Sequence, residues 1–542
     1  MYSVRDFTQN LRGNLFGGVT AAVVALPLAL AFGISSGVGP IAGLFGAICV
    51  GFFAAVFGGT APQISGPTGP MTVVMTAMTT EYLAQYPDDG LVLAFTTVFL
   101  GGCLQILFGI LRIGKYIIMV PYPVISGFMT GIGVIIILLE LGPLLGFASP
   151  ANIIEAVSSL PTQVTSAHVE TLLIGLLSLT IIYSWRGRFN QVMPAPLLAL
   201  IIATLAALFF GSNAGISQIG AIPTALPSLH IPSFRYALLE PMAINAIMLA
   251  VLGSIDSLLT SLVADNITGT QHHSDRELVG QGIGNAVAGL LGGLPGAGAT
   301  MRTMVNIRAG GTGPLSGVIH ALILLGIVSG LGFLFENIPL AALAGILIKV
   351  GIDIIDWPFL RRLLRIPKFP ALLMLTVLFL TVFVDLITAV FVGVFIKNLV
   401  TISKLSDLQL GQVIFSDGTT NLERLPIEEQ NMLSEHTGEA VLFRITGPIS
   451  YAVGRNLGKR FRDNIKSAKV LLIDITDAAI VGISSAMVLE EVIRKALASN
   501  TVVKLIGVHV EKHQELKQLG LVELVGKENC VDNVYQAFNS KH

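Results

Sequence analysis

Two stretches rich in glycine and proline interrupt otherwise apolar sequence, and they are the first places to look for chemistry. They span residues 63–70 and 292–302, and each runs directly into an apolar segment. This pattern is typical of helices that begin inside an apolar layer. The start of a helix carries unpaired N–H groups and a partial positive charge, so two such starts facing each other would form an anion site.

The residue types in both stretches suit such a site. Glycine and alanine let the backbone approach a ligand closely, and hydroxyl groups add hydrogen-bond donors. The candidate anion-binding residues, besides Arg302, are Ser65, Thr68, Gly69, Gly298, Ala299 and Thr300. The alternative is that the two stretches are plain loops between apolar helices.

Arg302 is the most informative charge. It lies about two residues inside the expected start of a helix, where a cation opposes the helix dipole. A charge at depth in a membrane is costly and usually faces a cavity or a partner. We expect Arg302 to face an anionic substrate; the alternatives are an ion pair with Asp256 or an extended side chain that reaches the membrane interface.

Asp256 and Thr260 lie four residues apart in an apolar segment and therefore share a helix face. A carboxylate and a hydroxyl beside the carbonyls of a broken helix are hard-oxygen ligands that suit Na⁺, and the carboxylate could instead take up a proton. The candidate cation ligands are Asp256, Thr260, Gly298 and Thr300, and Na⁺ is the candidate coupling ion. Asp256 as a fixed counter-charge to Arg302 stays open.

Composition sets the frame for these residues. The chain has 542 residues, is 53% hydrophobic and 12% charged, and carries a formal net charge of −1. These values exclude an ordinary soluble enzyme, a disordered chain and a nucleic-acid binder. Of the charged residues, 32 lie in residues 1–402 and 33 in the much shorter segment 403–542. We therefore predict a membrane domain over 1–402 and a water-soluble domain over 403–542.

The predicted membrane domain contains about fourteen apolar runs, and several of them are shorter than a full bilayer crossing. The runs cover residues 15–34, 41–58, 68–83, 91–111, 121–143, 170–184, 194–210, 242–264, 277–292, 300–312, 314–335, 339–355, 370–384 and 386–400. The two interrupted stretches open the third and the tenth run. A glycine pair six residues apart also occurs in both the fifth run (Gly127, Gly133) and the twelfth (Gly345, Gly351). We therefore predict an all-α polytopic domain built as a 7+7 inverted repeat.

Basic residues give the orientation. Arg112, Lys115 and the cluster from Arg361 to Lys368 follow even-numbered runs, as do Arg186 and Arg188. Basic loops stay in the cytoplasm, so we expect both termini there and the protein in the plasma (inner) membrane.

The tail alternates between strand and helix patterns. Residues 440–446, 469–476 and 502–508 read as strands, and residues 453–466, 484–497 and 513–519 as helices. This predicts a small cytoplasmic α/β domain with no phosphate loop and no catalytic triad. We expect a regulatory or assembly module, not an enzyme.

We expect the other polar residues in and beside the runs to be structural. Glu140, Lys349, Asp353 and Asp385 lie near the ends of runs, and Asp265 borders a polar loop. His272 and His273 in that loop have no cysteine or carboxylate at metal-ligand spacing, and the three cysteines form no metal or disulfide pattern.

The motifs together resemble the sulfate-permease (SulP) anion transporters, relatives of animal solute carrier family 26. The matching pieces are residues 24–31, 65–70, 263–265, 298–303 and 306–311, and their joint order covers essentially the whole chain. The resemblance implies fourteen spans in two inverted halves, a core domain that moves against a gate domain, homodimers, and a C-terminal STAS domain.

Within the family, residues 255–261, 277–285 and 350–357 most resemble the cyanobacterial sodium-dependent bicarbonate transporters. This resemblance implies that Asp256, Thr260, Gly298, Ala299 and Thr300 hold Na⁺. It also implies that Thr68 and the two helix starts hold bicarbonate. Arg302 departs from that branch, where the position is typically small and uncharged, so the arginine could replace the cation.

The leading hypothesis is a secondary active transporter of a small anion that works by alternating access, with bicarbonate uptake coupled to Na⁺ and no cofactor. Sulfate or a dicarboxylate, H⁺-coupled or exchanged, is the alternative substrate. Rivals of another class are an anion channel and a membrane-tethered signalling protein.

Overall fold

The computed structural model describes residues 4–117, 120–150, 153–185, 193–210, 216–220, 228–330, 332–384, 386–449, 468–480, 483–508, 518 and 520–539. The chain forms two compact units, Met1–Val394 and Phe395–His542. The division falls within one long helix, α19, and each unit is described by itself.

Unit 1 is helical, and each of the fourteen predicted runs coincides with a helix. These helices are α2 (Leu11–Ser35), α3 (Pro40–Phe57), α4 (Gly69–Gln85), α5 (Gly90–Ile110), α7 (Tyr122–Leu145), α9 (Val169–Ser184), α11 (Ala195–Phe210), α12 (Leu239–Thr268), α13 (Ser274–Leu290), α14 (Thr300–Arg308), α15 (Leu315–Gly330), α16 (Leu340–Ile354), α18 (Lys368–Phe383) and α19 (Leu386–Gln412).

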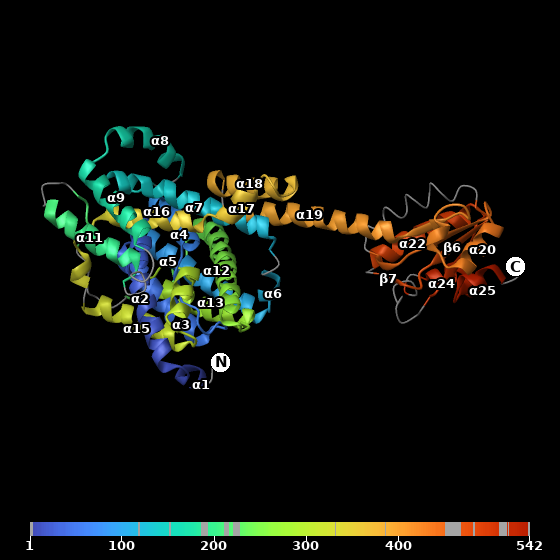
Figure 1. Ribbon diagram of the computed structural model, residues 1–542, viewed down its shortest axis with the longest axis horizontal. Helices are drawn as coiled ribbons and strands as arrows, with labels where there is room; N and C mark the ends of the chain where they lie inside the picture. The colour runs from blue at the N-terminus through green and yellow to red at the C-terminus, as the bar shows by residue number, and fades with distance from the viewer. Residues whose placement is uncertain are drawn as a thin grey trace. The chain divides into compact units, whose positions relative to one another are not determined.

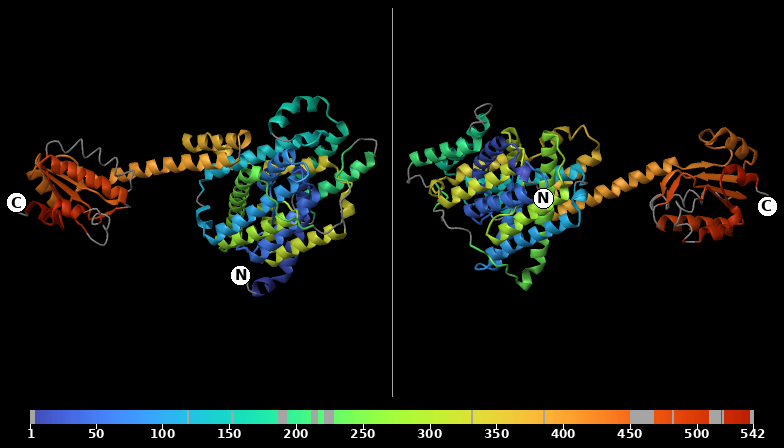
Figure 2. Two further views of the ribbon diagram at one scale, coloured as in Figure 1. Left: turned by 180° about the vertical axis from the view of Figure 1, so that it is seen from behind. Right: turned by 90° about the horizontal axis from the view of Figure 1, so that it is seen from below.

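Unit 1 also has several shorter elements, and all of them except η3, which falls at the end of the run predicted at 314–335, lie outside the predicted runs. They are α1 (Val4–Thr8), α6 (Gly114–Ile117), α8 (Ile153–Thr165), α17 (Trp357–Arg362), the 3-10 helices η2 (Tyr236–Leu238) and η3 (Gly332–Phe335), and the strands β1 (Ser65–Pro67) and β2 (Gly296–Gly298). In Figures 1 and 2, α8 lies on the side of unit 1 opposite α1.

Helix length and composition support a membrane domain. Among the described residues, six helices are long and apolar enough to cross a bilayer, or seven if α8 and α9, bent by 114°, count as one span. Further apolar helices, such as α15 and α18, are shorter. An apolar helix satisfies its own backbone hydrogen bonds, which lipid cannot do.

The helix–helix contacts of unit 1 recur when the helices of its two halves are exchanged. Replacing each of the fourteen helices by the one seven places away converts the α5–α13 contact into α15–α3, and α5–α12 into α15–α2. It likewise converts the α2–α14 contact into α12–α4, and the α9–α16 contact into α18–α7. This is the pairing expected of two halves with the same internal packing, and it supports the predicted 7+7 repeat.

The repeated glycines meet at the contact of α7 with α16. A Cβ placed on Gly351 would lie 2.8 Å from the carbonyl oxygen of Gly133, and a Cβ on Gly133 would lie 2.5 Å from the carbonyl oxygen of Gly351. Only glycine permits this approach, and small residues let membrane helices pack closely.

Unit 2 is an α/β domain around a five-stranded sheet of order β3-β4-β6-β8-β9, parallel except for β3. Its strands are β3 (Ile414–Ser416), β4 (Ala440–Arg444), β6 (Val470–Asp474), β8 (Val502–Ile506) and β9 (Cys530–Val531), with a separate parallel pair of β5 (Gly447–Ile449) and β7 (Ala478–Ile480). The helices are α20 (Ile427–Glu435), α22 (Ile483–Ala498), α24 (Leu521–Val525), α25 (Val534–Asn539), η4 (Leu422–Arg424) and η5 (Lys527–Asn529).

The sheet separates two apolar clusters. Phe443, Leu471 and Ile473 pack with residues of α22 on one face, and Leu442 and Leu472 pack with residues of α25 on the other. Burial on both faces explains why the parallel strands are nearly all apolar.

The sequence placed three of these strands and one of these helices correctly and did not predict the others. The strands predicted at 440–446, 469–476 and 502–508 and the helix predicted at 484–497 are present. The helix expected at 453–466 lies outside the described residues, as does nearly all of the helix expected at 513–519.

Candidate functional site

The two interrupted stretches meet inside unit 1. Strand β1 pairs with β2 in antiparallel register, with Ser65 opposite Gly298, Gly66 opposite Ala297 and Pro67 opposite Gly296. Helix α4 begins just after β1 and α14 just after β2. Two segments far apart in the chain therefore lie side by side, and a helix begins directly after each of them. We call this paired region of β1 and β2 the β1–β2 crossing.

The crossing depends on residues without bulk. A Cβ on Gly296 would lie 2.5 Å from the carbonyl oxygen and 3.0 Å from the Cα of Gly66. Gly66 itself has a φ of 151°, a conformation that side chains disfavour. Neither the Thr68 nor the Ala299 side chain caps the helix that it precedes, so the first N–H groups keep their capacity to bind a ligand.

Side chains from two neighbouring helices hold β2. Asn285 of α13 accepts from the Gly296 N–H at 2.7 Å and donates to the Gly296 carbonyl oxygen at 2.9 Å. Ser257 of α12 accepts from the Gly298 N–H at 3.0 Å. The backbone of β2 is thus satisfied by groups that lie outside the strand.

A buried carboxylate organises the chain before β1. Glu277 of α13 accepts from the backbone N–H groups of Gly59 and Thr60 at 2.8 and 2.9 Å. It also accepts from the side-chain amides of Gln63 and Gln281, both at 2.8 Å. Four hydrogen bonds compensate the cost of burying this charge.

A cavity of about 420 Å³ borders the crossing. Its lining includes seven of the predicted residues: Thr68, Gly69, Asp256, Gly298, Ala299, Thr300 and Arg302. Apolar residues of α2, α7 and α16 form the opposite wall, namely Leu28, Phe32, Met129, Val350 and Ile354. A few convergent polar groups against apolar walls are typical of a small-ligand site.

Ser65 lies apart from this lining. It is buried, and its hydroxyl accepts a hydrogen bond from Gln281 Nε2 at 2.6 Å. The structure therefore places the Ser65 side chain in the framework behind β1, whereas the other predicted anion-binding residues border the cavity.

Arg302 is buried, with 2% of its surface exposed. Its Nη2 donates to the carbonyl oxygen of Pro67 at 2.5 Å, whereas its Nη1 has no hydrogen-bond partner among the described residues. The Arg302 and Asp256 charges interact, but the two side chains form no ion pair within 4 Å. Arg302 therefore keeps a donor that is not committed to the protein.

Asp256 and Thr260 bring oxygen atoms to the same place. The Thr260 hydroxyl donates to the Gly298 carbonyl oxygen at 2.9 Å and lies 2.7 Å from the Thr300 hydroxyl. Asp256 Oδ2 is shielded from solvent and makes no hydrogen bond of ordinary geometry, although the carboxylate lies near Thr68. One uncommitted carboxylate oxygen among neutral oxygens fits a hard cation such as Na⁺.

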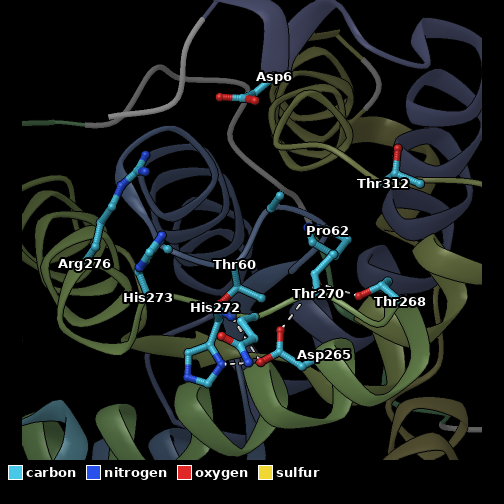
Figure 3. Close-up of a pocket in the computed structure, with 13 residues that line it drawn as sticks. Asp6, Thr60, Pro62, Asp265, Thr268, Thr270, His272, His273, Arg276 and Thr312 are labelled. Carbon is cyan, nitrogen blue, oxygen red and sulfur yellow. Dashed lines mark hydrogen bonds and ion pairs between the residues drawn. The ribbon is translucent and has the colours of Figure 1, made fainter.

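A second cavity of about 400 Å³ lies at the far end of α12 (Figure 3). Asp265 accepts from His272, with 2.6 Å between Oδ2 and Nδ1 and 3.1 Å to the backbone N–H. His273 and Arg276 also line this cavity. Among the residues that the structure describes, no three His, Cys, Asp or Glu side chains gather as a metal site.

One of the remaining charged residues, Asp353, also borders the first cavity. Lys349 pairs with Asp353, and Glu140 is buried in α7. Asp385 lies outside the described residues, as do Arg186 and Arg188.

Sequence reasoning missed the residues that support the site, chiefly Asn285, Glu277 and Ser257. Their signal was present: a carboxamide and a carboxylate inside an apolar run are expensive in lipid unless they bond to backbone. What the sequence lacked was the identity of their partners.

Comparison with known proteins now decides the family. Residues 11–377 match the sulfate permease family, and residues 431–537 match the STAS domain. The chain belongs to the sulfate permease family.

Named relatives of this sulfate permease are transporters. The chain is 45% identical to the bicarbonate transporter BicA of Synechocystis over 530 residues, covering 98% of this chain and 94% of that one. It is 30% identical to a putative sulfate transporter, YvdB, of Bacillus subtilis, covering 92% of each. The protein is thus an integral membrane transporter and not an enzyme.

Solved structures agree with the fold. The transmembrane domain of a cyanobacterial BicA matches with a TM-score of 0.66 and 52% identity, covering 70% of this chain and 98% of that one. Murine Slc26a9 in its inward-facing state matches with a TM-score of 0.81, covering 99% of this chain and 92% of that one. At 16% identity, the second match speaks for the architecture alone.

Proposed function

We propose that this protein is a secondary active transporter that takes up bicarbonate by alternating access, coupled to Na⁺. The observation that carries the proposal is the cavity beside the β1–β2 crossing, where two helix starts, Arg302 and the oxygens around Asp256 converge. The bicarbonate transporters among its relatives share nearly half of their residues with this chain, which favours the same substrate.

The anion would lie against the two helix starts. The backbone N–H groups after Thr68 and Ala299 carry the positive ends of two dipoles, and Thr68 adds a hydroxyl donor. The Arg302 guanidinium, which lines the same cavity, adds a full positive charge. Bicarbonate is small, planar and singly charged, so few donors and little volume suffice for it.

The cation would lie between α12 and β2. Its ligands would be the Asp256 carboxylate, the Thr260 and Thr300 hydroxyls and the Gly298 carbonyl oxygen, with Ala299 beside them. Na⁺ held there would balance the anion charge, so that the pair crosses as a neutral unit. This neutrality is the physical reason for coupling, because an unbalanced charge inside the membrane is costly.

The larger framework completes the proposal. Residues 1–402 would form the transport domain, with a core that carries the site and a gate that it moves against, and residues 403–542 the cytoplasmic STAS domain. By the distribution of basic loops, both termini would lie in the cytoplasm and the protein would be in the plasma (inner) membrane. The family resemblance adds a homodimer.

Uptake into proteoliposomes tests the function. Purified protein would be given labelled bicarbonate with an inward Na⁺ gradient, with an equal K⁺ gradient, and with no gradient. We expect saturable bicarbonate uptake that accumulates substrate only with Na⁺. Saturable uptake that does not depend on the Na⁺ gradient would refute the proposed coupling to Na⁺. The absence of bicarbonate uptake would refute bicarbonate as the substrate.

A second candidate is transport of sulfate or a dicarboxylate, by exchange or with H⁺. Arg302 favours it, because the guanidinium supplies inside the site the positive charge that Na⁺ would otherwise bring. Labelled sulfate and fumarate in the same vesicles distinguish this case. An anion channel would equilibrate its substrate without accumulating it, and a signalling protein would tolerate changes at both helix starts.

A further inference from the structure

His320 of α15 is buried without any hydrogen bond. None of its surface is exposed, and neither Nδ1 nor Nε2 has a partner among the described residues. A neutral imidazole has one donor and one acceptor nitrogen. Leaving both unpaired in an apolar core costs enough that a partner or a bound water is expected.

Two more buried polar groups without a hydrogen-bond partner lie near the short strand β1. Arg302 Nη1 is a buried donor without an acceptor, and Gln281 Oε1 is a buried acceptor without a donor. Gln281 bonds Ser65 through its other amide atom, and a Cβ on Gly66 would lie 2.8 Å from Arg302 Nη1. Three helices, α13, α14 and α15, therefore each bring one unsatisfied group to β1.

Gly51 of α3 shows where the imidazole points. A Cβ on Gly51 would lie 3.1 Å from His320 Nδ1 and 3.2 Å from the Ser65 carbonyl oxygen. The ring and the backbone of β1 thus border the same space. The Arg302 charge also acts on His320, so the two side chains lie within electrostatic range.

We infer that His320 is a positioning residue for Arg302. Its neutral imidazole accepts a hydrogen bond from Arg302 Nη1 through one bound water, opposite the Nη2 bond to Pro67, and so fixes the guanidinium toward the anion. A carboxylate in this place would cancel the arginine charge, whereas an imidazole satisfies the donor and leaves the charge for substrate. The inference rests on the proposed anion site.

The test compares His320→Leu with His320→Gln, because leucine removes the acceptor and glutamine retains one. We expect His320→Leu to raise the KM for the transported anion about tenfold with little change in the maximal rate, and His320→Gln to stay near wild type. The matched control is Leu324→Ala, a fully buried residue one turn further along α15, which should lower the melting temperature and leave KM unchanged.

A double-mutant cycle separates positioning from general packing. In an Arg302→Ala background, His320→Leu should have no further effect on KM, because the group it positions is gone. An unchanged KM in His320→Leu, or an equal effect in both backgrounds, would overturn the inference.

Two further outcomes keep the proposals distinct. A pH profile of transport that differs between wild type and His320→Gln would mean that His320 carries a proton instead, and the positioning role would be wrong. If wild type takes up no bicarbonate, the proposed function fails. The His320 variants are then compared by the binding affinity of sulfate and fumarate, measured from the thermal shift of the purified protein.

Discussion

The hydroxyls of Thr260 and Thr300 lie 2.7 Å apart, and this contact joins the C-terminal half of α12 to the first residue of α14. Thr260 also donates to the carbonyl oxygen of Gly298, the last residue of β2. The continuous helix and the broken one are therefore linked at the point where the proposed Na⁺ ligands gather.

Replacing Thr260 by valine keeps the shape and removes the hydroxyl. We expect the Na⁺ concentration for half-maximal bicarbonate uptake to rise about threefold to tenfold, because one ligand and the bond to Gly298 are lost. Uptake measured over a Na⁺ series checks this. Thr268→Val, at the last residue of the same helix, should leave the Na⁺ response unchanged, because the Thr268 hydroxyl bonds only to the Ala264 carbonyl oxygen and to Thr270 in the loop that follows.

Asp256→Asn removes the one carboxylate of the proposed cation site. Because a neutral amide binds Na⁺ weakly, we expect uptake to lose its Na⁺ dependence. Vesicle uptake with Na⁺ and K⁺ gradients is the measurement, and Asp265→Asn, on the same helix, should retain the Na⁺ dependence. A normal apparent Na⁺ affinity in Asp256→Asn would rule out the assigned role.

Arg302→Ala removes the buried guanidinium beside the cavity. If it faces the anion, the KM should rise about 10- to 100-fold, the range for a hydrogen bond to a charged group. Initial uptake rates over an anion series test this. Arg308→Ala, an exposed arginine at the end of the same helix, is the control. Unchanged KM with a lower melting temperature would instead indicate a purely structural arginine.

Gly296→Ala tests the crossing itself. The added methyl group would overlap the backbone of Gly66, which cannot move without separating β1 from β2. We expect a marked loss of folded protein and a lower melting temperature in detergent. Gly326→Ala on α15, where nothing lies within 4 Å of the added atom, should behave like wild type. Equal stability of the two variants would contradict the tight crossing.

Asp417 gives unit 2 a pH dependence. Burial tends to raise its pKa, but hydrogen bonds from the backbone and hydroxyls of Thr419 and Thr420 outweigh this and hold the pKa well below its usual range. A lowered pKa stabilises the fold above the ordinary value of about 4, and this stabilisation is lost as the pH falls through the folded-state pKa.

Hydrogen–deuterium exchange of the full chain measures this effect. Asp417→Asn should speed exchange of the segment after β3 relative to wild type at pH 7. The difference should shrink at low pH, where the wild-type carboxyl is also neutral. Asp532 is an exposed aspartate in the same unit, and Asp532→Asn should change neither the exchange rate of the segment after β3 nor the pH dependence of that rate. A difference that persists in acid would show that charge is not the cause.

The sequence by itself determined the fourteen predicted helices of unit 1, part of unit 2 and seven of the residues that line the first cavity. The length of each apolar run set the helices, since a helix in lipid needs only its own backbone partners. The Gly/Pro interruptions marked both helix starts, and the four-residue spacing placed Asp256 and Thr260 on one face of α12. These are local properties, so they can be deduced without a tertiary structure.

Only the tertiary structure decided which groups meet. That Ser65 pairs with Gly298, and that the Ser65 hydroxyl turns toward Gln281 rather than the cavity, depends on packing between the two halves of the chain. The same holds for the hydrogen bonds of Asn285 to β2 and for the burial of His320 without a partner among the described residues. A buried polar group must find a partner, but sequence spacing fixes partners only within one helix. Between helices, the close contacts that glycine permits determine which groups come within hydrogen-bonding distance.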